Sequence, residues 1–243
     1  MLTDELFTYL FDGQAHLLAP PMGAWLESSR RFTAFVTTFR DKIRKKLRVT
    51  QDQESLLDLR LELETAYLLL QERPLSVVYE PHLSERVRGP DFAVTFTTSF
   101  TFMVEVTRLR AVAQEQTTAP DPTIPFIDER LVDTICSKLG QLLSQRSNVL
   151  LVGVDALYLT QSDLRAMMLR IQQRAERNDP TFLQRHRFRD RTDFFHYYQR
   201  LSEILVRGPQ VQSDGRMVAW ANPQAKHPLP GKARTALYRS QAV

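Results

Sequence analysis

Two acidic residues occupy strand-like runs at positions where an apolar side chain would pack better. In "GPDFAVTFTTSFTFMVEVTRLR", residues 89–110, Asp91 opens one run and Glu105 lies inside the next. Successive side chains of a strand point to opposite faces, so Glu105 shares a face with Thr107. A hairpin would bring both carboxylates to one end of a sheet, where they repel unless a cation or a shared proton intervenes. A hard divalent cation, bound by carboxylate and carbonyl oxygens, suits such a pair.

A third acid, Glu62, lies on the helical run that precedes these strands. Helical spacing puts it on the same face as Leu59, Ala66 and Leu69, so we expect it to point toward the sheet. A salt bridge to a basic neighbour is the alternative role for this side chain. Glu64 faces another way, and we interpret it as a surface acid.

The elements that position these acids can be predicted from hydrophobic periodicity. Apolar residues from Trp25 to Leu47 recur at steps of three and four, which predicts one amphipathic helix over 24–47. Pro74 ends the next helix. The predicted order is helix 54–72, strands 75–81, 91–96 and 100–109, helix 128–143 and buried strand 148–155.

The remainder of the chain continues with alternating elements. We expect a helix over 161–177, a short aromatic helix near 193–198, and strands at 201–208 and 216–220. Residues 111–125 contain three prolines and predict a surface loop that is long enough to act as a lid. The last residues, from Gly231, predict a mobile basic tail.

The order helix, strand, strand, strand, helix, strand over residues 54–155, together with Pro90-Asp91 and "EVT" at 105–107, resembles the PD-(D/E)XK nuclease superfamily. The resemblance implies an α/β protein with a restriction-endonuclease-like core, a mixed sheet flanked by helices. It also implies a metal-dependent phosphodiesterase that uses Mg²⁺ or Mn²⁺.

The resemblance assigns roles to particular residues. Asp91 and Glu105 would be metal ligands, the carbonyl of Val106 would be a further ligand, and Glu62 would assist. A bound metal of this kind lowers the pKa of a water molecule and stabilises charge on a phosphate in flight.

The sequence departs from the family pattern at Thr107, where the family usually has a lysine that orients or activates the water. Members of the superfamily can supply this lysine from another element. Lys138, on the predicted helix after the strands, is the candidate, and Gln141 one turn further could position it. The alternative is that Lys138 extends from a buried helix into solvent.

The resemblance implies nucleic acid, in the first place DNA, as the partner, and the charge distribution is compatible with it. The chain has 243 residues and a formal net charge of +4. Six basic residues lie in "RDKIRKKLR", 40–48, and four arginines surround Phe188 in "RHRFRDR", 185–191. Such clusters suit a phosphate backbone, although a solvated helix face has the same composition. The aromatic residues near the second cluster could stack on bases or form a core, and we favour the core.

The length and composition predict a single domain over 1–243. We divide it into a basic N-terminal helical arm (1–50), a nuclease-like core (51–155) and a C-terminal helical and strand extension (156–243). The sequence leaves a homodimer open. It has no apolar run long enough for a bilayer and one cysteine, Cys136, which together favour a cytoplasmic protein with no membrane partner.

Several other chemistries lack sequence support. The five histidines lie at no metal-site spacing, and no serine lies in a nucleophile-elbow motif. Neither "GxxxxGK" nor "GxGxxG" occurs, so a nucleotide cofactor is not indicated. Cys136 is better explained as a small buried residue than as a nucleophile.

Two alternatives to a working nuclease follow from the same residues. In the first, the chain is a degenerate nuclease-fold module that binds nucleic acid or a protein, and Thr107 marks lost chemistry. In the second, the acids form a structural salt-bridge network with Arg108 or Arg110. By strand alternation Arg108 leaves the face of Glu105, and a surface charge is its simplest role.

Overall fold

The fold is described from a computed structural model. It describes residues 3–50, 52–81, 89–110, 129–155, 159–208 and 217–242. The proline-rich segment at 111–125, for which we predict a lid, lies outside the described residues.

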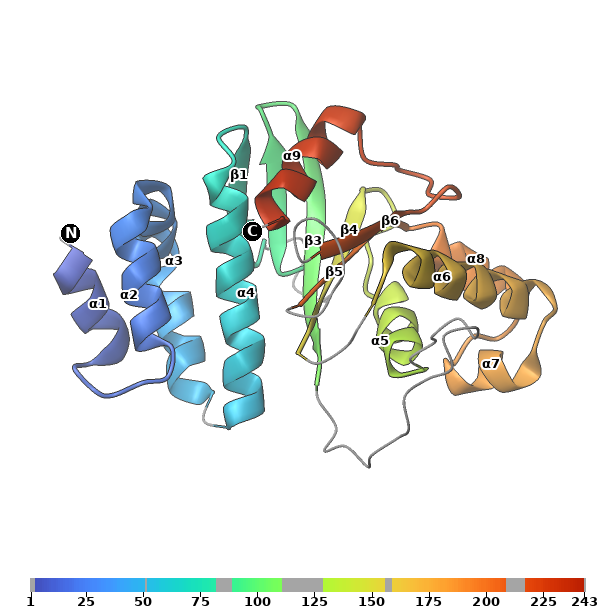
Figure 1. Ribbon diagram of the computed structural model, residues 1–243, viewed down its shortest axis with the longest axis horizontal. Coiled ribbons are helices and arrows are strands. Elements are labelled where there is room, and N and C mark those ends of the chain that lie inside the picture. Colours follow the sequence, from blue (N-terminus) through green and yellow to red (C-terminus); the bar gives the residue numbers. More distant parts are fainter. Residues whose placement is uncertain are drawn as a thin grey trace.

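The described residues form nine helices and six strands (Figure 1). The helices are α1 (Thr3–Phe11), α2 (Ala19–Ser28), α3 (Arg30–Val49), α4 (Gln53–Gln71), α5 (Glu129–Leu139), α6 (Gln161–Glu176), α7 (Pro180–Arg185), α8 (Arg191–Tyr198) and α9 (Gly231–Gln241). The strands are β1 (Leu75–Tyr79), β2 (Phe92–Phe96), β3 (Phe100–Leu109), β4 (Asn148–Val154), β5 (Leu201–Arg207) and β6 (Met217–Ala221). The protein is therefore of the α/β class, as predicted.

The six strands form one mixed sheet in the order β1-β2-β3-β4-β5-β6. The first three strands are antiparallel, β3, β4 and β5 run parallel, and β6 is antiparallel to β5. Strand β4 is buried along its whole length, as its continuous apolar sequence predicts. The predicted hairpin through residues 97–99 is confirmed by the β2–β3 pairing.

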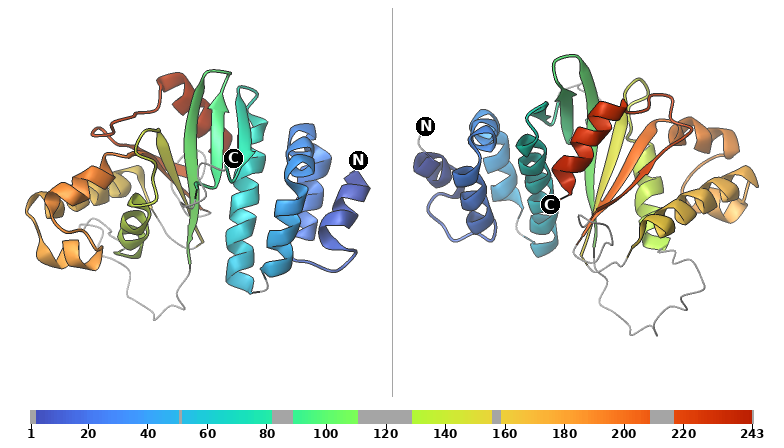
Figure 2. Two further views of the ribbon diagram at one scale, coloured as in Figure 1. Left: turned by 180° about the vertical axis from the view of Figure 1, so that it is seen from behind. Right: turned by 45° about the horizontal axis from the view of Figure 1, so that its top comes forward.

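Helices cover both faces of the sheet (Figure 2). On one face the helices α1–α4 and α9 share a hydrophobic core with alternate residues of the strands, such as Val104 and Leu151. On the other face, α5, α6, α7 and α8 pack on the residues between them, such as Leu150 and Val152. Phe188, Phe194 and Tyr198 are buried in this second core, so packing is their role, as we favoured.

The predicted single helix over 24–47 is wrong, because the chain forms two helices that meet at Ser29. Ser29 has extended backbone angles and its hydroxyl accepts a hydrogen bond from the Phe32 amide at 3.2 Å. This is an N-cap, which begins a new helix. The apolar spacing of the sequence continues through the break. Trp25 and Phe32, one from each helix, pack edge to face and belong to the same core. Periodicity alone therefore joins the two helices.

The predicted mobile tail is also wrong, because residues 231–241 form α9, which lies against α4 (Figure 1). The anchor is Glu203 on β5, whose side chain is 0% exposed. It accepts hydrogen bonds at 2.6 Å from Arg234 Nε and from the Tyr238 hydroxyl. A buried carboxylate needs such partners, so α9 completes the fold.

Side chains cap both edges of the sheet. At β6, the Gln161 side chain accepts from the Ala219 amide at 3.2 Å and donates to the Ala219 carbonyl. At β1, the Arg31 guanidinium donates to the outward carbonyl of Leu75. Across the described residues, no helix is both long and apolar enough to cross a bilayer.

Candidate functional site

Asp91 and Glu105 meet where β2 begins and β3 continues past it. The β2–β3 register pairs Phe92 with Val104, so the continued register places Asp91 opposite Glu105. Asp91 Oδ2 accepts a hydrogen bond of 2.7 Å from the Val106 amide. The Asp91 side chain therefore takes the place of a backbone acceptor at the end of the hairpin.

The proline of the Pro90-Asp91 pair explains how a carbonyl comes to be available here. In the same register, Pro90 is opposite Val106. In an antiparallel ladder every second facing pair exchanges both backbone hydrogen bonds, and because the Val106 amide points toward β2, its carbonyl points to the same side. Proline has no N–H to donate. The Val106 carbonyl thus points toward the start of β2, where Asp91 lies, and Pro90 opposite it donates no backbone hydrogen bond.

Asp91 is held in an environment that disfavours its charge. Burial, followed by the carboxylates of Glu105 and Glu62, raises the pKa of Asp91 to about 7. The Val106 amide and Lys46 act in the opposite direction. An acid with this degree of perturbation is typical of functional sites.

Lys138, our candidate for the displaced lysine, contacts Glu105 of the acid pair. Its Nζ atom donates to Glu105 Oε1 at 2.8 Å, and the Glu105 side chain is only 8% exposed. Gln141 Oε1 lies 3.4 Å from the same Nζ atom. Lys138 therefore does not extend freely into solvent. Thr107, on the same face of β3, is half-buried and contributes no charge.

Glu62 reaches the site, and it does so as part of an ion pair. Its Oε1 atom accepts from Lys46 Nζ at 2.7 Å, which is the salt bridge that we weighed as the alternative for this residue. Glu62 is nevertheless near enough to Asp91 to raise its pKa. Glu64 faces elsewhere and pairs with Arg207 at 3.1 Å.

The sequence reasoning did not identify two further members of this cluster, Lys46 and Glu80. Lys46 Nζ also lies 2.7 Å from Glu80 Oε1. Lys42, one helical turn earlier, donates from Nζ to the Glu80 carbonyl at 3.1 Å. The only sequence signal for these contacts is the spacing of Lys42 and Lys46, which puts them on one helix face. It is hard to recognise because both residues lie in the basic run 40–48.

The cluster as a whole carries excess negative charge. Its carboxylates are Glu62, Glu80, Asp91 and Glu105, and its ammonium groups are Lys46 and Lys138. Four negative and two positive charges leave a formal charge of −2 when all groups are ionised, and Lys42, which donates to the Glu80 carbonyl, lowers the excess to −1. The excess is negative in either count, which favours a bound cation.

The donor atoms of the cluster fit a hard cation. All of the candidate ligands are oxygens, from Asp91, Glu105 and the Val106 carbonyl. Among the described residues, no three Asp, Glu, His or Cys side chains form a group that could hold a metal ion by themselves. Mg²⁺ is commonly bound through one or two carboxylates, with water and substrate phosphate completing its shell, so two carboxylates meet this requirement.

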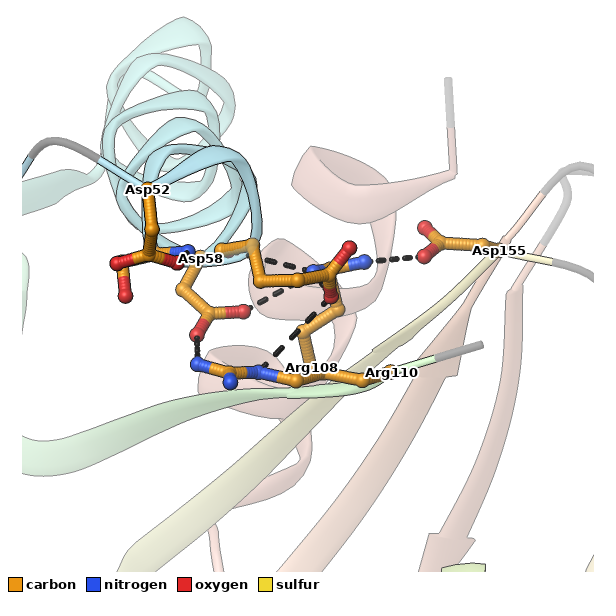
Figure 3. A network of polar contacts seen from close by, with 7 residues as sticks. Asp52, Asp58, Arg108, Arg110 and Asp155 are labelled. Atoms are coloured by element: carbon orange, nitrogen blue, oxygen red, sulfur yellow. Dashed lines mark hydrogen bonds and ion pairs between the residues drawn. The ribbon is translucent and has the colours of Figure 1, made fainter. Parts of the chain in front are cut away.

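Arg108 forms a separate network that does not include Asp91 or Glu105 (Figure 3). Its side chain is 4% exposed, so its expected surface role is wrong. Its partners are the carboxylates of Glu54, Asp58 and Asp155. Arg110 shares Asp58 at 2.6 Å. The structural salt-bridge network therefore exists, but with other acids than those we considered.

Much of the first basic cluster is engaged within the chain. Arg44 and Arg48 both pair with Asp12. In the second cluster, Arg185 pairs with Asp133 and Arg189 with Asp193. These contacts account for part of the clusters as intramolecular ion pairs, and an interaction with nucleic acid remains a prediction.

Comparisons with known proteins give no relative: neither a family model, nor a curated protein, nor a solved structure matches this chain. Its function must therefore be argued from its own residues.

Proposed function

We propose that this protein is a metal-dependent phosphodiesterase that cleaves nucleic acid, in the first place DNA, with a PD-(D/E)XK-like site. The observation that carries the proposal is the position of Lys138. Its ammonium lies 2.8 Å from Glu105 in the same cluster as Asp91, although it comes from α5 and the strand position has Thr107. A basic group is thus available beside the acid pair.

The chain's own residues have distinct tasks in this proposal. Asp91, Glu105 and the Val106 carbonyl would hold Mg²⁺ or Mn²⁺, which when bound supplies charge stabilisation and a water of lowered pKa. Lys138 would orient that water or the phosphate through its N–H groups, because a lysine ammonium has three donors. Glu105 and Gln141 fix the position of Lys138. Glu62 acts indirectly, through its ion pair with Lys46.

A second candidate function is a nuclease-like module that binds nucleic acid or a protein without cleavage. Thr107 favours it, because the usual strand lysine is absent. In this case the raised pKa of Asp91 reflects a buried acid pair that no longer needs a cation.

Cleavage assays separate the two functions. We expect plasmid and single-stranded DNA to be cut in Mg²⁺ or Mn²⁺ and left intact in EDTA. Asp91→Asn should abolish cutting, since the amide oxygen can still accept from Val106 while the negative charge is lost. Glu27→Gln, at an exposed acid on α2, is the matched control and should cut at the wild-type rate.

The result that overturns the phosphodiesterase is cutting by Asp91→Asn at the wild-type rate, or no cutting by the wild type in any of these conditions. Binding of DNA in EDTA without any cutting would support the module instead.

A further inference from the structure

Lys46 brings a second ammonium to the cluster from outside the strands and α5. It lies on α3, which packs beside α4 in both views (Figures 1 and 2). Its Nζ atom is 2.7 Å from Glu62 Oε1 and 2.7 Å from Glu80 Oε1. The side chain is 30% exposed, so a ligand in solvent can reach it.

Among the described residues, the carboxylates that pair with Lys46 leave one of its N–H groups without an acceptor. An ammonium has three N–H groups, and the two carboxylates use two of them. Within the described ranges, no acceptor is recorded for the third. The carboxylates of Glu62 and Glu80 hold the ammonium in place and favour its charged form.

Glu80, one of the two acids that pair with Lys46, has a strained backbone conformation. Its φ is +42°, in the left-handed region that non-glycine residues rarely adopt. Its amide donates to the Asp91 carbonyl at 2.8 Å, and its carbonyl accepts from Lys42. Strain of this kind, about 1 to 3 kcal/mol, is concentrated at functional sites.

Tyr79 is a third neighbour of the Lys46 ammonium. Its ring centroid is 4.8 Å from Lys46 Nζ, and the residue is fully buried. Its hydroxyl lies beside the Glu62 carboxylate, and burial together with this carboxylate raises the pKa of Tyr79. The Tyr79 ring therefore packs against the Lys46 ammonium and helps to hold it in place.

We propose that Lys46 contacts a phosphate oxygen of the substrate beside the Asp91–Glu105 pair, and that Glu62 and Glu80 are positioning residues for its ammonium. The inference rests on the proposed function and adds the N-terminal helices to the site. Lys46 and Lys138 then come to the acid pair from helices on opposite faces of the sheet, one from α3 and one from α5.

The test measures binding of a fluorescent DNA duplex by anisotropy over a series of salt concentrations, with Ca²⁺ as the divalent cation and a gel to verify that the duplex stays intact. The variants are Lys46→Gln and the control Lys232→Gln, which removes the same charge from an exposed position on α9. A phosphate contact contributes about 0.9 to the slope of log K against log salt. We expect Lys46→Gln to lose about this much slope and to bind about tenfold more weakly, while Lys232→Gln matches the wild type.

Thermal unfolding of each variant accompanies the binding measurement. If Lys46→Gln does not fold, the double variant Lys46→Gln/Glu80→Gln keeps the local charge unchanged and should show the same loss of slope. The inference alone fails if the wild type binds and cuts DNA but Lys46→Gln, or the double variant, binds like Lys232→Gln. If the wild type neither binds nor cuts, the proposed function fails and this inference fails with it.

Discussion

Replacing Arg108 with methionine should destabilise the protein by about 2 kcal/mol. Arg108 is the common partner of Glu54, Asp58 and Asp155, and its own side chain is buried (Figure 3). Methionine keeps most of the apolar stem of the side chain and removes the guanidinium. The variant therefore tests the charge contacts with little loss of packing.

The magnitude follows from the exposure of the partners. Removing one member of a fully buried ion pair costs about 3 to 5 kcal/mol, because the other charge stays buried and unpaired. Here the three carboxylates are 37–45% exposed, so water can solvate them once Arg108 is gone. Each contact is then closer to a surface ion pair, about 0.5 to 1 kcal/mol, and three of them give about 1.5 to 3 kcal/mol.

Urea unfolding followed by circular dichroism measures this loss, with Arg110→Met as the matched control. Arg110 lies on the same strand and shares Asp58, but its side chain is 53% exposed. We expect its replacement to cost less than about 1 kcal/mol. Equal losses in the two variants would show that burial of Arg108 does not determine the strength of the network, and the reasoning would be wrong.

Three further predictions concern other parts of the fold and the site. Tyr238→Phe removes one of the hydrogen bonds to buried Glu203 and should lower the free energy of unfolding by about 1.5 to 3 kcal/mol. Hydrogen exchange in α9 should become faster, and unchanged exchange would contradict the anchoring role. Burial lowers the pKa of His186 below its ordinary value of 6.5, so the unfolded chain binds more protons. The stability that neutral His186 provides is present above about pH 6.5 and is lost as the pH falls through the folded pKa. The difference in unfolding free energy between wild type and His186→Gln should therefore shrink from about pH 7.5 to 5.5. A constant difference would refute this. Lys138→Gln should lower the cleavage rate by about 10² or more, whereas Arg170→Gln, at an exposed site on α6, should leave it unchanged; equal rates would remove Lys138 from the mechanism.

The strands and the acid pair could be predicted because their signals are local. Alternation in residues 91–109 predicted the hairpin, and the hairpin alone brings Asp91 and Glu105 into register. Lys138 could be predicted because α5 is the next described element after β3 and has a regular apolar face. Each of these inferences needs only the period of one element and the order of its neighbours.

The missed features depend on contacts between residues that are distant in sequence. Lys46 and Glu80 are separated by a whole helix and a strand, and their contact depends on how α3 packs on α4. The helix α9 supplies the hydrogen-bond partners that Glu203, buried in β5, requires. Glu203 was itself a signal, since a carboxylate inside an apolar strand implies a cation or donor from another element.

The amide of Gln161 has a consequence for how the protein behaves at high concentration. At β6 it presents one acceptor and one donor to Ala219, as a residue of a neighbouring strand would. The exposed backbone of an edge strand is a template on which a second molecule can add its own strand and begin to aggregate. By occupying that template with its own side chain, the molecule reduces the risk of joining its sheet to that of another copy.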